Sequence, residues 1–441
     1  DPDNGNGSAS VINLDNVQKV LNTNADIALA AYEDSVDTAK TLQTAIATFA
    51  GEPTQANLDA AKSAWLAARE PYGQTEVYRF RLSPIDSTDY TNEDGPEGDI
   101  NAWPLGEALI DYVVEGNDFG DDQVAVTEHA TGVNYPAMNI INSDVEITKE
   151  LISNTATAED EKDVIAGYHA IEFMLWGQDL NLDGSADTLE ARDSSGGQRP
   201  LTDFTSDQYA ARRLQFMAVV AEKLIEDLES VRDGWAEGAA YRAAFTSAPD
   251  EATAKQKLAE ILTGMGTLSE GELAGERMQI AFSANSQEDE HSCFSDNTHR
   301  DIWLNAEGVA NSYYGVYAGY DSDDDGTDDM TARAVDGYGI DDYLTDAGLD
   351  AVKAEMEAAL AETETQYMAI DQSARAGTPV DNLIQTAVRN ADNPMYKGIL
   401  ALNAQSTVIA NIATALTIDG DVVDPDASVC DTTDPATECE E

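Results

Sequence analysis

The feature that most constrains the fold is a series of long segments in which Ala, Leu and Ile recur every three or four residues. This spacing puts apolar side chains on one face of an α-helix, while the alternation of apolar and polar residues that marks half-buried strands is scarce. The pattern therefore predicts an all-α chain. The expected helices cover residues 11–50, 55–81, 145–153, 159–176, 207–228, 252–268, 299–317, 346–376 and 381–415.

Breaks in the pattern predict how the helices are grouped. Ser83-Pro84, Asp233-Gly234 and Asn393-Pro394 are stop signals, because Pro lacks the N–H that a helix interior needs and Gly weakens a helix. A distant internal duplication of two halves is an open alternative to two unrelated bundles. We expect a flexible leader (1–11), an N-terminal helical bundle (12–234), a C-terminal helical bundle (235–420) and an acidic tail (421–441).

The charge of the chain limits its partners. There are 84 acidic and 24 basic residues, and the formal net charge of −60 is spread along the sequence. Nucleic acid is therefore disfavoured as a partner, as is an anionic membrane surface in the absence of a lipid anchor. We expect a solvated acidic surface suited to salty water, with long irregular acidic loops over about 85–135 and 179–202.

The first residues and the cysteines indicate an exported protein. Residues 1–8 form a polar leader of the kind that follows a cleaved signal or a lipidated cysteine. Cys430 and Cys439 are placed for one disulfide, which implies an oxidising compartment, and Cys293 is left as a reactive or a buried thiol. No run of 18 apolar residues occurs, so no transmembrane segment is expected.

One of the four histidines lies in the apolar run Gly167-Tyr168-His169-Ala170-Ile171-Glu172. On a helix, His169 and Glu172 share a face, and the flanking apolar spacing directs both toward a cleft or a facing helix. Imidazole and carboxylate are ligands for zinc, iron or copper. The alternative is that His169 is a hydrogen-bonded core residue.

A second polar segment extends from Trp65 to Asp86. Tyr72, Glu76 and Arg79 fall at helical spacing on one face of the helix expected over 55–81. Glu76 is the residue that would complete a metal site with His169 and Glu172, and the alternative is an ion pair between Glu76 and Arg79. Tyr72, Arg79 and Asp86 are expected to line the ligand-binding cleft beside this site.

A third cluster, over residues 286–301, combines histidine, thiol and carboxylate just before an apolar helix. Capping by Asp296 or Asn297 explains part of it. The remaining ligand types exceed what capping requires, so we expect this cluster to line a ligand-binding cleft. Its expected cleft residues are His291, Ser292, Cys293, Asp296, Asn297 and His299.

Two Asp-rich runs resemble calcium loops. The first matches all the ligand positions of a twelve-residue EF-hand loop, and the second has Ala332 where the final acid is needed. Chance in so acidic a chain is the alternative. The expected calcium ligands are Asp179, Asn181, Asp183, Ser185, Asp187 and Glu190 in the first run and Asp321, Asp323 and Asp325 in the second.

Taken together, Gly167-x-His169-x-x-Glu172 and the segments 65–86 and 286–300 resemble the imelysin family, including its iron-regulated branch, over about residues 12–420. The resemblance implies an all-helical, exported and often lipid-anchored protein of two bundle-like domains. It also implies a Gram-negative envelope, in the periplasm or as an outer-membrane lipoprotein, a connection with iron acquisition, and a historical classification as a metallopeptidase.

The chemistry of the motif favours binding over hydrolysis. A hydrolytic zinc site needs three protein ligands, an open position for water and a general base, and no H-E-x-x-H or other base at fixed spacing is present. We predict that the protein binds iron, or an iron-related ligand, at the G-x-H-x-x-E site between two helical domains. The alternatives are a zinc-type metallopeptidase, a surface protein that binds a peptide or another partner without metal, and noncovalent haem binding.

Overall fold

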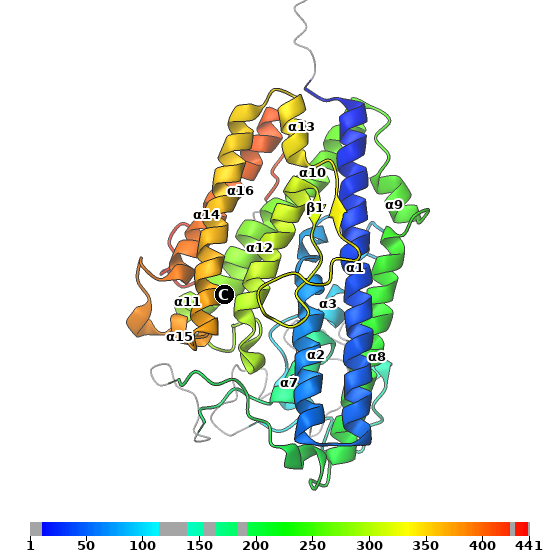
Figure 1. Ribbon diagram of the computed structural model, residues 1–441, viewed down its shortest axis with the longest axis vertical. Coiled ribbons are helices and arrows are strands. Elements are labelled where there is room, and N and C mark those ends of the chain that lie inside the picture. Colours follow the sequence, from blue (N-terminus) through cyan, green and yellow to red (C-terminus); the bar gives the residue numbers. More distant parts are fainter. Residues whose placement is uncertain (1–10, 114–138, 154–163, 183–191, 424–427, 440–441) are drawn as a thin grey trace, which may run out of the picture.

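The computed structural model describes residues 11–113, 139–153, 164–182, 192–423 and 428–439. It confirms the all-α prediction, because long helices run along the length of the molecule and strands are almost absent (Figure 1). The long helices are α1 (Leu14–Gly51), α2 (Gln55–Gly73), α7 (Gly167–Trp176), α8 (Ala210–Trp235), α10 (Glu251–Thr267), α12 (Thr298–Tyr314), α14 (Asp350–Arg375) and α16 (Pro394–Ala415), together with a π-helix, η4 (Leu268–Gln279).

Short elements connect these helices. A two-stranded antiparallel sheet pairs Val316 with Asp336 and Tyr317 with Val335. The short elements are η1 (Glu76–Tyr78), α3 (Glu97–Ile100), α4 (Glu107–Ile110), α5 (Lys149–Ile152), η3 (Leu201–Phe204), α9 (Ala240–Phe245), α11 (Ile280–Ala284), η5 (Cys293–Ser295), β1 (Val316–Tyr317), β2 (Val335–Asp336), α13 (Ile340–Asp346), α15 (Val380–Leu383) and η6 (Thr386–Val388).

The long helices pack in two groups that meet along the molecule. Helix α1 packs against α2 and α8, with α7 against α2 and α8 (Figure 1). On the other side α14 packs against α16 and α12, and α16 packs against η4 and α10. Helix α12 also contacts α2 and η1, so it lies between the groups. The larger apolar core includes side chains of both groups, from Val17 on α1 to Ile409 on α16. The division near residue 235 stays a prediction.

Side-chain caps fix several helix starts. Asn13, Thr54 and Asp250 each accept a hydrogen bond from a backbone N–H three residues later, which satisfies one of the donors that a helix N-terminus leaves free. The predicted break at Asn393-Pro394 is confirmed, because Asn393 caps α16 and Pro394 is its first residue.

The helix predicted over 55–81 is too long, and Ser83-Pro84 is not its end. Helix α2 ends at Gly73, η1 follows as a single 3₁₀ turn, and Arg79 has extended backbone. Pro71 and Gly73 weaken the last turn. A Cβ on Gly73 would lie 2.6 Å from Cβ of Leu304, so α2 and α12 cross closely here. Tyr72, Glu76 and Arg79 therefore do not share one helical face.

The helix predicted over 159–176 is interrupted, because the described residues 164–166 are not helical. Its described part begins at Gly167, whose φ of +78° is incompatible with a right-handed helix continuing through it. Val164 instead forms a parallel bridge with Leu105. The π-helix η4 was not predicted. It extends α10 by twelve residues, and such helices often occur at functional sites.

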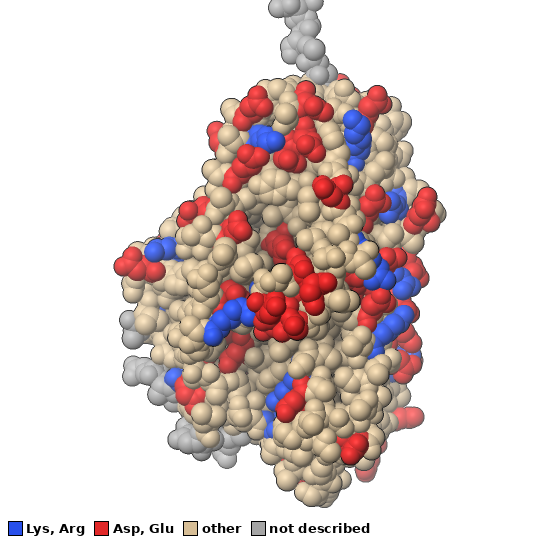
Figure 2. All heavy atoms as spheres, viewed as in Figure 1, with Lys and Arg blue, Asp and Glu red and all other residues tan. Residues whose placement is uncertain are grey.

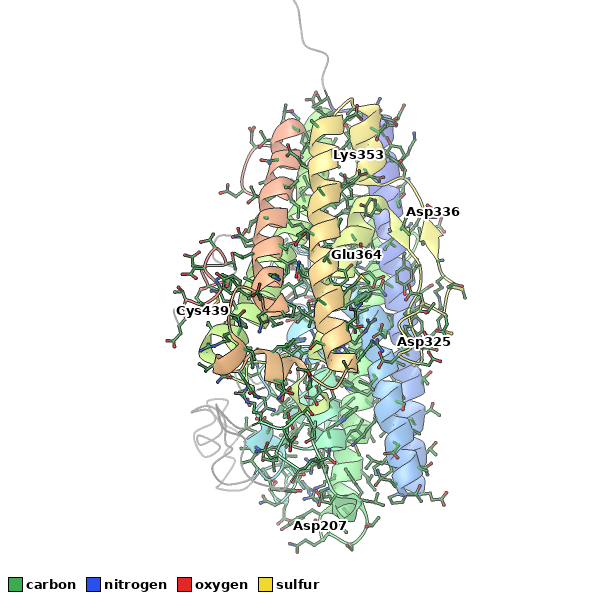
Figure 3. All side chains as sticks on the ribbon, turned by 60° about the vertical axis from the view of Figure 1, so that its left-hand side comes forward. Asp207, Asp325, Asp336, Lys353, Glu364 and Cys439 are labelled. Atoms are coloured by element: carbon green, nitrogen blue, oxygen red, sulfur yellow. A yellow bond between two sulfur atoms is a disulfide. The ribbon has the colours of Figure 1, made fainter. Side chains whose placement is uncertain are left out.

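The surface is strongly acidic, as the composition predicts. Patches of Asp and Glu side chains are scattered over the face in Figure 2, with a group over the loop that joins β1 and β2. No helix in the described ranges is both long and apolar enough to cross a bilayer. Cys430 and Cys439 form the predicted disulfide, in a tail that the Gln279 amide holds by hydrogen bonds to three of its carbonyls (Figure 3).

Candidate two-histidine centre

The first residue of the motif places α7 against α3. A Cβ on Gly167 would lie 2.3 Å from the backbone oxygen of Ile100, and the φ of +78° is one that side-chain-bearing residues rarely adopt. At the next residue, the indole N–H of Trp65 donates to the carbonyl of Tyr168 at 2.8 Å. Glycine is therefore required where the chain enters the motif helix.

His169 and Glu172 contact each other inside the protein. His169 Nδ1 lies 2.8 Å from Glu172 Oε2, and both side chains are fully buried. The other carboxyl oxygen, Oε1, accepts hydrogen bonds from the backbone N–H of Ser295 at 3.0 Å and from its hydroxyl at 2.6 Å. The carboxyl group of Glu172 is thus fixed by the 286–301 cluster and in turn fixes the His169 ring.

His291 has a matching arrangement on the opposite side. Its Nδ1 lies 2.8 Å from Asp301 Oδ2, which also accepts a hydrogen bond from the Ser292 hydroxyl. Asp301 Oδ1 is held by Arg69, whose Nη2 lies 3.0 Å away. The Arg69 guanidinium is buried over the ring of Tyr168, 4.9 Å from its centroid. Each histidine therefore has its Nδ1 bound to a carboxyl group that a neighbouring serine orients.

The two imidazole rings meet edge to face. Their centroids are 4.7 Å apart, and the ring of Trp103 lies 4.8 Å from that of His169 and 6.3 Å from that of His291. His169 Nε2 is buried and has no hydrogen-bond partner among the residues that the structure describes. Because a buried polar atom without a partner costs about 1–3 kcal/mol, this nitrogen requires an explanation. We call the two rings, with Glu172, Asp301 and Trp103, the two-histidine centre.

Burial sets the protonation of the centre. It raises the pKa of Glu172 to about 8. Burial, together with His291 and Arg69, lowers the pKa of His169 well below its usual value, and burial lowers that of His291 as well. Burial alone would raise the pKa of Asp301, but Arg69 and His291 outweigh it and lower this pKa. At neutral pH both imidazoles are thus neutral, which is the form that binds metal ions, Glu172 is protonated and Asp301 is ionised.

Glu76 lies in a neighbouring ionic cluster. Its Oε2 accepts from Arg79 at 3.0 Å and from Arg277 of η4 at 2.7 Å, and these arginines also pair with Glu272. Burial alone would raise the pKa of Glu76, but Arg277 and Arg79 lower it to about 2. The ion pair between Glu76 and Arg79 is the alternative that the sequence left open, and it forms.

Glu76 does not form a group of potential metal ligands with His169 and Glu172 in the part of the chain that the structure describes. Among the residues that the structure describes, no three His, Cys, Asp or Glu side chains that include His169 bring their ligand atoms within 4.8 Å of one another. The connection is indirect: Asn101 accepts from Arg69 at 2.5 Å and donates to Glu76 at 3.4 Å.

Tyr72 and Asp86 have structural surroundings. The Tyr72 ring is buried 5.0 Å from that of Tyr168. Asp86 accepts from the backbone N–H groups of Phe80, Arg81 and Ser83, and thereby fixes the turn after η1.

The remaining residues of the third cluster have separate surroundings. His299 lies on α12 with its Nδ1 3.1 Å from Asp371 of α14, outside the two-histidine centre. Asn297 is the N-terminal cap residue of α12, without a capping hydrogen bond from its side chain. Cys293 is a buried free thiol whose pKa burial raises well above its usual value. Asp296 lies near Asp179 and Asp381.

The structure describes only some of the predicted calcium ligands. Asp183, Ser185, Asp187 and Glu190 lie outside the described residues. Asn181 accepts from the backbone N–H of Asp193 at 2.9 Å. In the second run, Asp321, Asp323 and Asp325 gather their carboxylates within 4.8 Å.

Sequence reasoning missed Arg69, Trp103, Asp301 and Ser295. Only Arg69 carried a usable signal, because it interrupts the apolar face that Trp65, Ala68 and Tyr72 form on α2. A charge at such a position indicates a buried partner. The partner, Asp301, is more than 200 residues away, and no spacing rule connects the two.

Comparison with known proteins agrees with the fold. The model of the imelysin family, peptidase family M75, matches residues 28–409. Iron-regulated protein A of Synechococcus elongatus is 34% identical over 79 residues, which are 18% of this chain and 20% of that protein. The crystal structure of a protein described as an iron-regulated protein A precursor, from Parabacteroides distasonis, has a TM-score of 0.59 at 16% identity and covers 93% of this chain and 97% of its own. That likeness shows the shared fold. Because the family model covers most of the sequence, the chain belongs to the imelysin family.

Proposed function

We propose that this protein binds a transition-metal ion through Nε2 of His169 and Nε2 of His291. The observation that carries the proposal is the buried Nε2 of His169, which has no partner and belongs to a ring packed against a second imidazole. Metal-binding histidines commonly bond their other nitrogen to a carboxylate, which fixes the ring and its tautomer. Both rings have this arrangement.

This arrangement revises the predicted ligand set. Glu172 and Asp301 act as orienting groups, because their oxygens are already bonded to His169, His291 and the two serines. Glu76 is held by Arg277 and Arg79 and is left out. Two neutral imidazoles suit iron(II), zinc or copper, with the other positions filled by water or by a ligand carried with the ion.

Iron is the preferred ion, and iron acquisition in the cell envelope is the proposed context. The relatives named above are called iron-regulated protein A. A disulfide in the C-terminal tail fits an oxidising compartment. The ion is cargo in this proposal, and the acidic surface provides an attractive field for cations on their way to the protein.

Peptide hydrolysis has less support. A hydrolytic zinc site needs a third protein ligand, an open position for substrate and a base. His169 is fully buried and His291 is 3% exposed, so a polypeptide cannot reach the centre in this conformation.

His169→Asn tests the proposal. Asparagine places its side-chain amide near the position of Nδ1, so it keeps a hydrogen-bond partner for Glu172 but has no atom in place of Nε2. Metal content after loading with iron(II) without oxygen, or with zinc, is measured by elemental analysis. The wild type is expected to retain about one equivalent, and the variant to lose it while keeping its far-ultraviolet circular dichroism.

His299→Asn is the matched control. His299 is also buried, and its Nδ1 is also bonded to a carboxylate, but it lies outside the centre. It is expected to retain the ion. Equal metal content in the wild type and both variants would refute the proposed site.

A further inference from the structure

A second cluster of ligand atoms lies on the other side of the 286–301 segment and takes no part in the proposed function. Asp179 follows α7, Asp296 precedes α12, and Asp381 lies on α15. One carboxylate oxygen of each lies within 4.8 Å of the others, and Asp179 and Asp381 are buried. Three segments that are remote in sequence thus converge on one point.

Two further buried side chains beside this cluster each carry an oxygen that has no hydrogen-bond partner among the residues that the structure describes. The Gln287 amide donates to Asp179 Oδ2, which fixes its position beside the cluster, and its own Oε1 is buried without a hydrogen-bond partner. Glu290 is fully buried; the Thr298 hydroxyl donates to its Oε1 at 3.0 Å, but its Oε2 has no partner. These oxygens are an observation independent of the acidic cluster, because in folded proteins such atoms are normally satisfied.

The local negative charge also favours a bound cation. The carboxylates of Asp296 and Asp381 are the strongest charged neighbours of Glu290. Arg192 is a positive group in their vicinity, and its guanidinium donates to the main-chain oxygens of Asp381 and Asn285. Four carboxyl groups, including that of Glu290, are thus clustered here, and buried like charges repel strongly at low dielectric.

We propose that Asp179, Asp296 and Asp381, with Gln287 and Glu290, bind a hard divalent cation, for which calcium is the best match. Calcium takes six to eight oxygen ligands at about 2.3–2.6 Å. Ligands on opposite sides of it are therefore up to about 5 Å apart, which agrees with the 4.8 Å limit within which the three carboxylates lie. This site differs from both Asp-rich loops, since it shares only Asp179 with the first of them.

The ion would link segments that lie far apart in the sequence. It would join the chain after α7 to α15 through the segment that also carries His291 and Ser295. Calcium would thereby hold the segment that orients the two-histidine centre. The proposal of a cation site does not depend on metal binding at that centre.

Calorimetric titration of calcium chloride into chelator-treated full-length protein tests the proposal. Asp296→Asn and Asp381→Asn are each expected to weaken one calcium equivalent at least about tenfold, because the site loses a charged ligand. Without calcium, both variants should unfold at the same temperature as the wild type or a higher one, because a repelling charge is gone. The wild type should show the largest rise in unfolding temperature when calcium is added.

Asp325→Asn is the control, since Asp325 is an exposed acid of the other cluster (Figure 3). It is expected to leave this equivalent intact. Should Asp381→Asn fail to fold, Asp296→Asn decides, because its carboxyl group is only partly buried. Unchanged calcium affinity and stoichiometry in a folded Asp296→Asn would overturn the proposal, as would loss of all binding in Asp325→Asn alone.

Discussion

Replacing Glu172 by glutamine should separate metal affinity from stability. Burial raises the pKa of Glu172 to about 8, so at pH 7 the side chain is protonated and glutamine is its close isostere. The amide oxygen of the glutamine can keep both hydrogen bonds from Ser295. Its NH₂ group then faces His169 Nδ1 and donates to it. The free energy of unfolding of the metal-free protein should change by less than about 1 kcal/mol, because no hydrogen bond is lost.

Metal affinity should nevertheless fall. A donor at Nδ1 forces the His169 proton onto Nε2, which is the atom that must bind the ion. To restore the other tautomer, the glutamine amide must rotate and give up both Ser295 hydrogen bonds. Two hydrogen bonds at about 1–1.5 kcal/mol each give a cost of about 2–3 kcal/mol, which corresponds to roughly 30- to 150-fold weaker binding.

Competition with a chromophoric chelator for zinc or iron(II) measures this loss, and urea denaturation measures stability. In the wild type, affinity should rise about tenfold per pH unit below pH 8 and level off above it, because metal binding then releases the Glu172 proton. In Glu172→Gln this pH dependence should disappear. Unchanged affinity at pH 7, or an unchanged pH profile, would refute the assignment of Glu172 as the group that sets the tautomer.

Three further predictions concern stability. Gly167→Ala should destabilise the protein by about 2–4 kcal/mol in urea, because alanine disfavours the positive φ and its Cβ would meet a backbone oxygen 2.3 Å away; a loss below 1 kcal/mol would contradict the close packing of α7 on α3. Arg69→Met should cost about 3–5 kcal/mol, since it leaves the buried carboxylate of Asp301 without its ion pair, and a neutral effect would show that the pair is not needed. Burial raises the pKa of both Glu107 and Glu172 from 4.5 to about 8, so the folded state holds protons that the unfolded state has released, and stability should fall by at least about 2 kcal/mol from pH 5.5 to 8.5 at constant ionic strength. A flat profile in urea, or an unchanged slope in Glu107→Gln, would contradict the pH argument.

The sequence predicted helices well where an apolar stripe defines them. Helices α8 and α14, and the start of α16 at Pro394, follow from the spacing of apolar residues and from stop signals. A helix buries the side chains that its own periodicity aligns on one face. The prediction for α2 went past its end, and the prediction for α7 ran through the break before Gly167. There, Gly73 leaves room for the side chain of Leu304 and Gly167 for the backbone of Ile100, and these close approaches exist only in the folded chain.

The candidate site was predictable only through local motifs. His169, Glu172 and His291 stand out because ligand types cluster in sequence, and the structure brings all three together. Glu76 was assigned to their group on the assumption of one continuous helix. Asp301 and Asp381 were not singled out, because their partners come from distant segments and nothing in the local spacing marks them.

X-ray absorption spectroscopy at the iron edge tests the central claim most directly. Wild-type protein loaded with one equivalent of iron(II) should show nitrogen neighbours and the outer-shell scattering of two imidazole rings. In His169→Asn the imidazole scattering should drop by half or vanish with the bound iron, while His299→Asn should match the wild type. A first shell of oxygen alone, identical in all three proteins, would place the iron on the carboxylate clusters and contradict the two-histidine centre as the metal site.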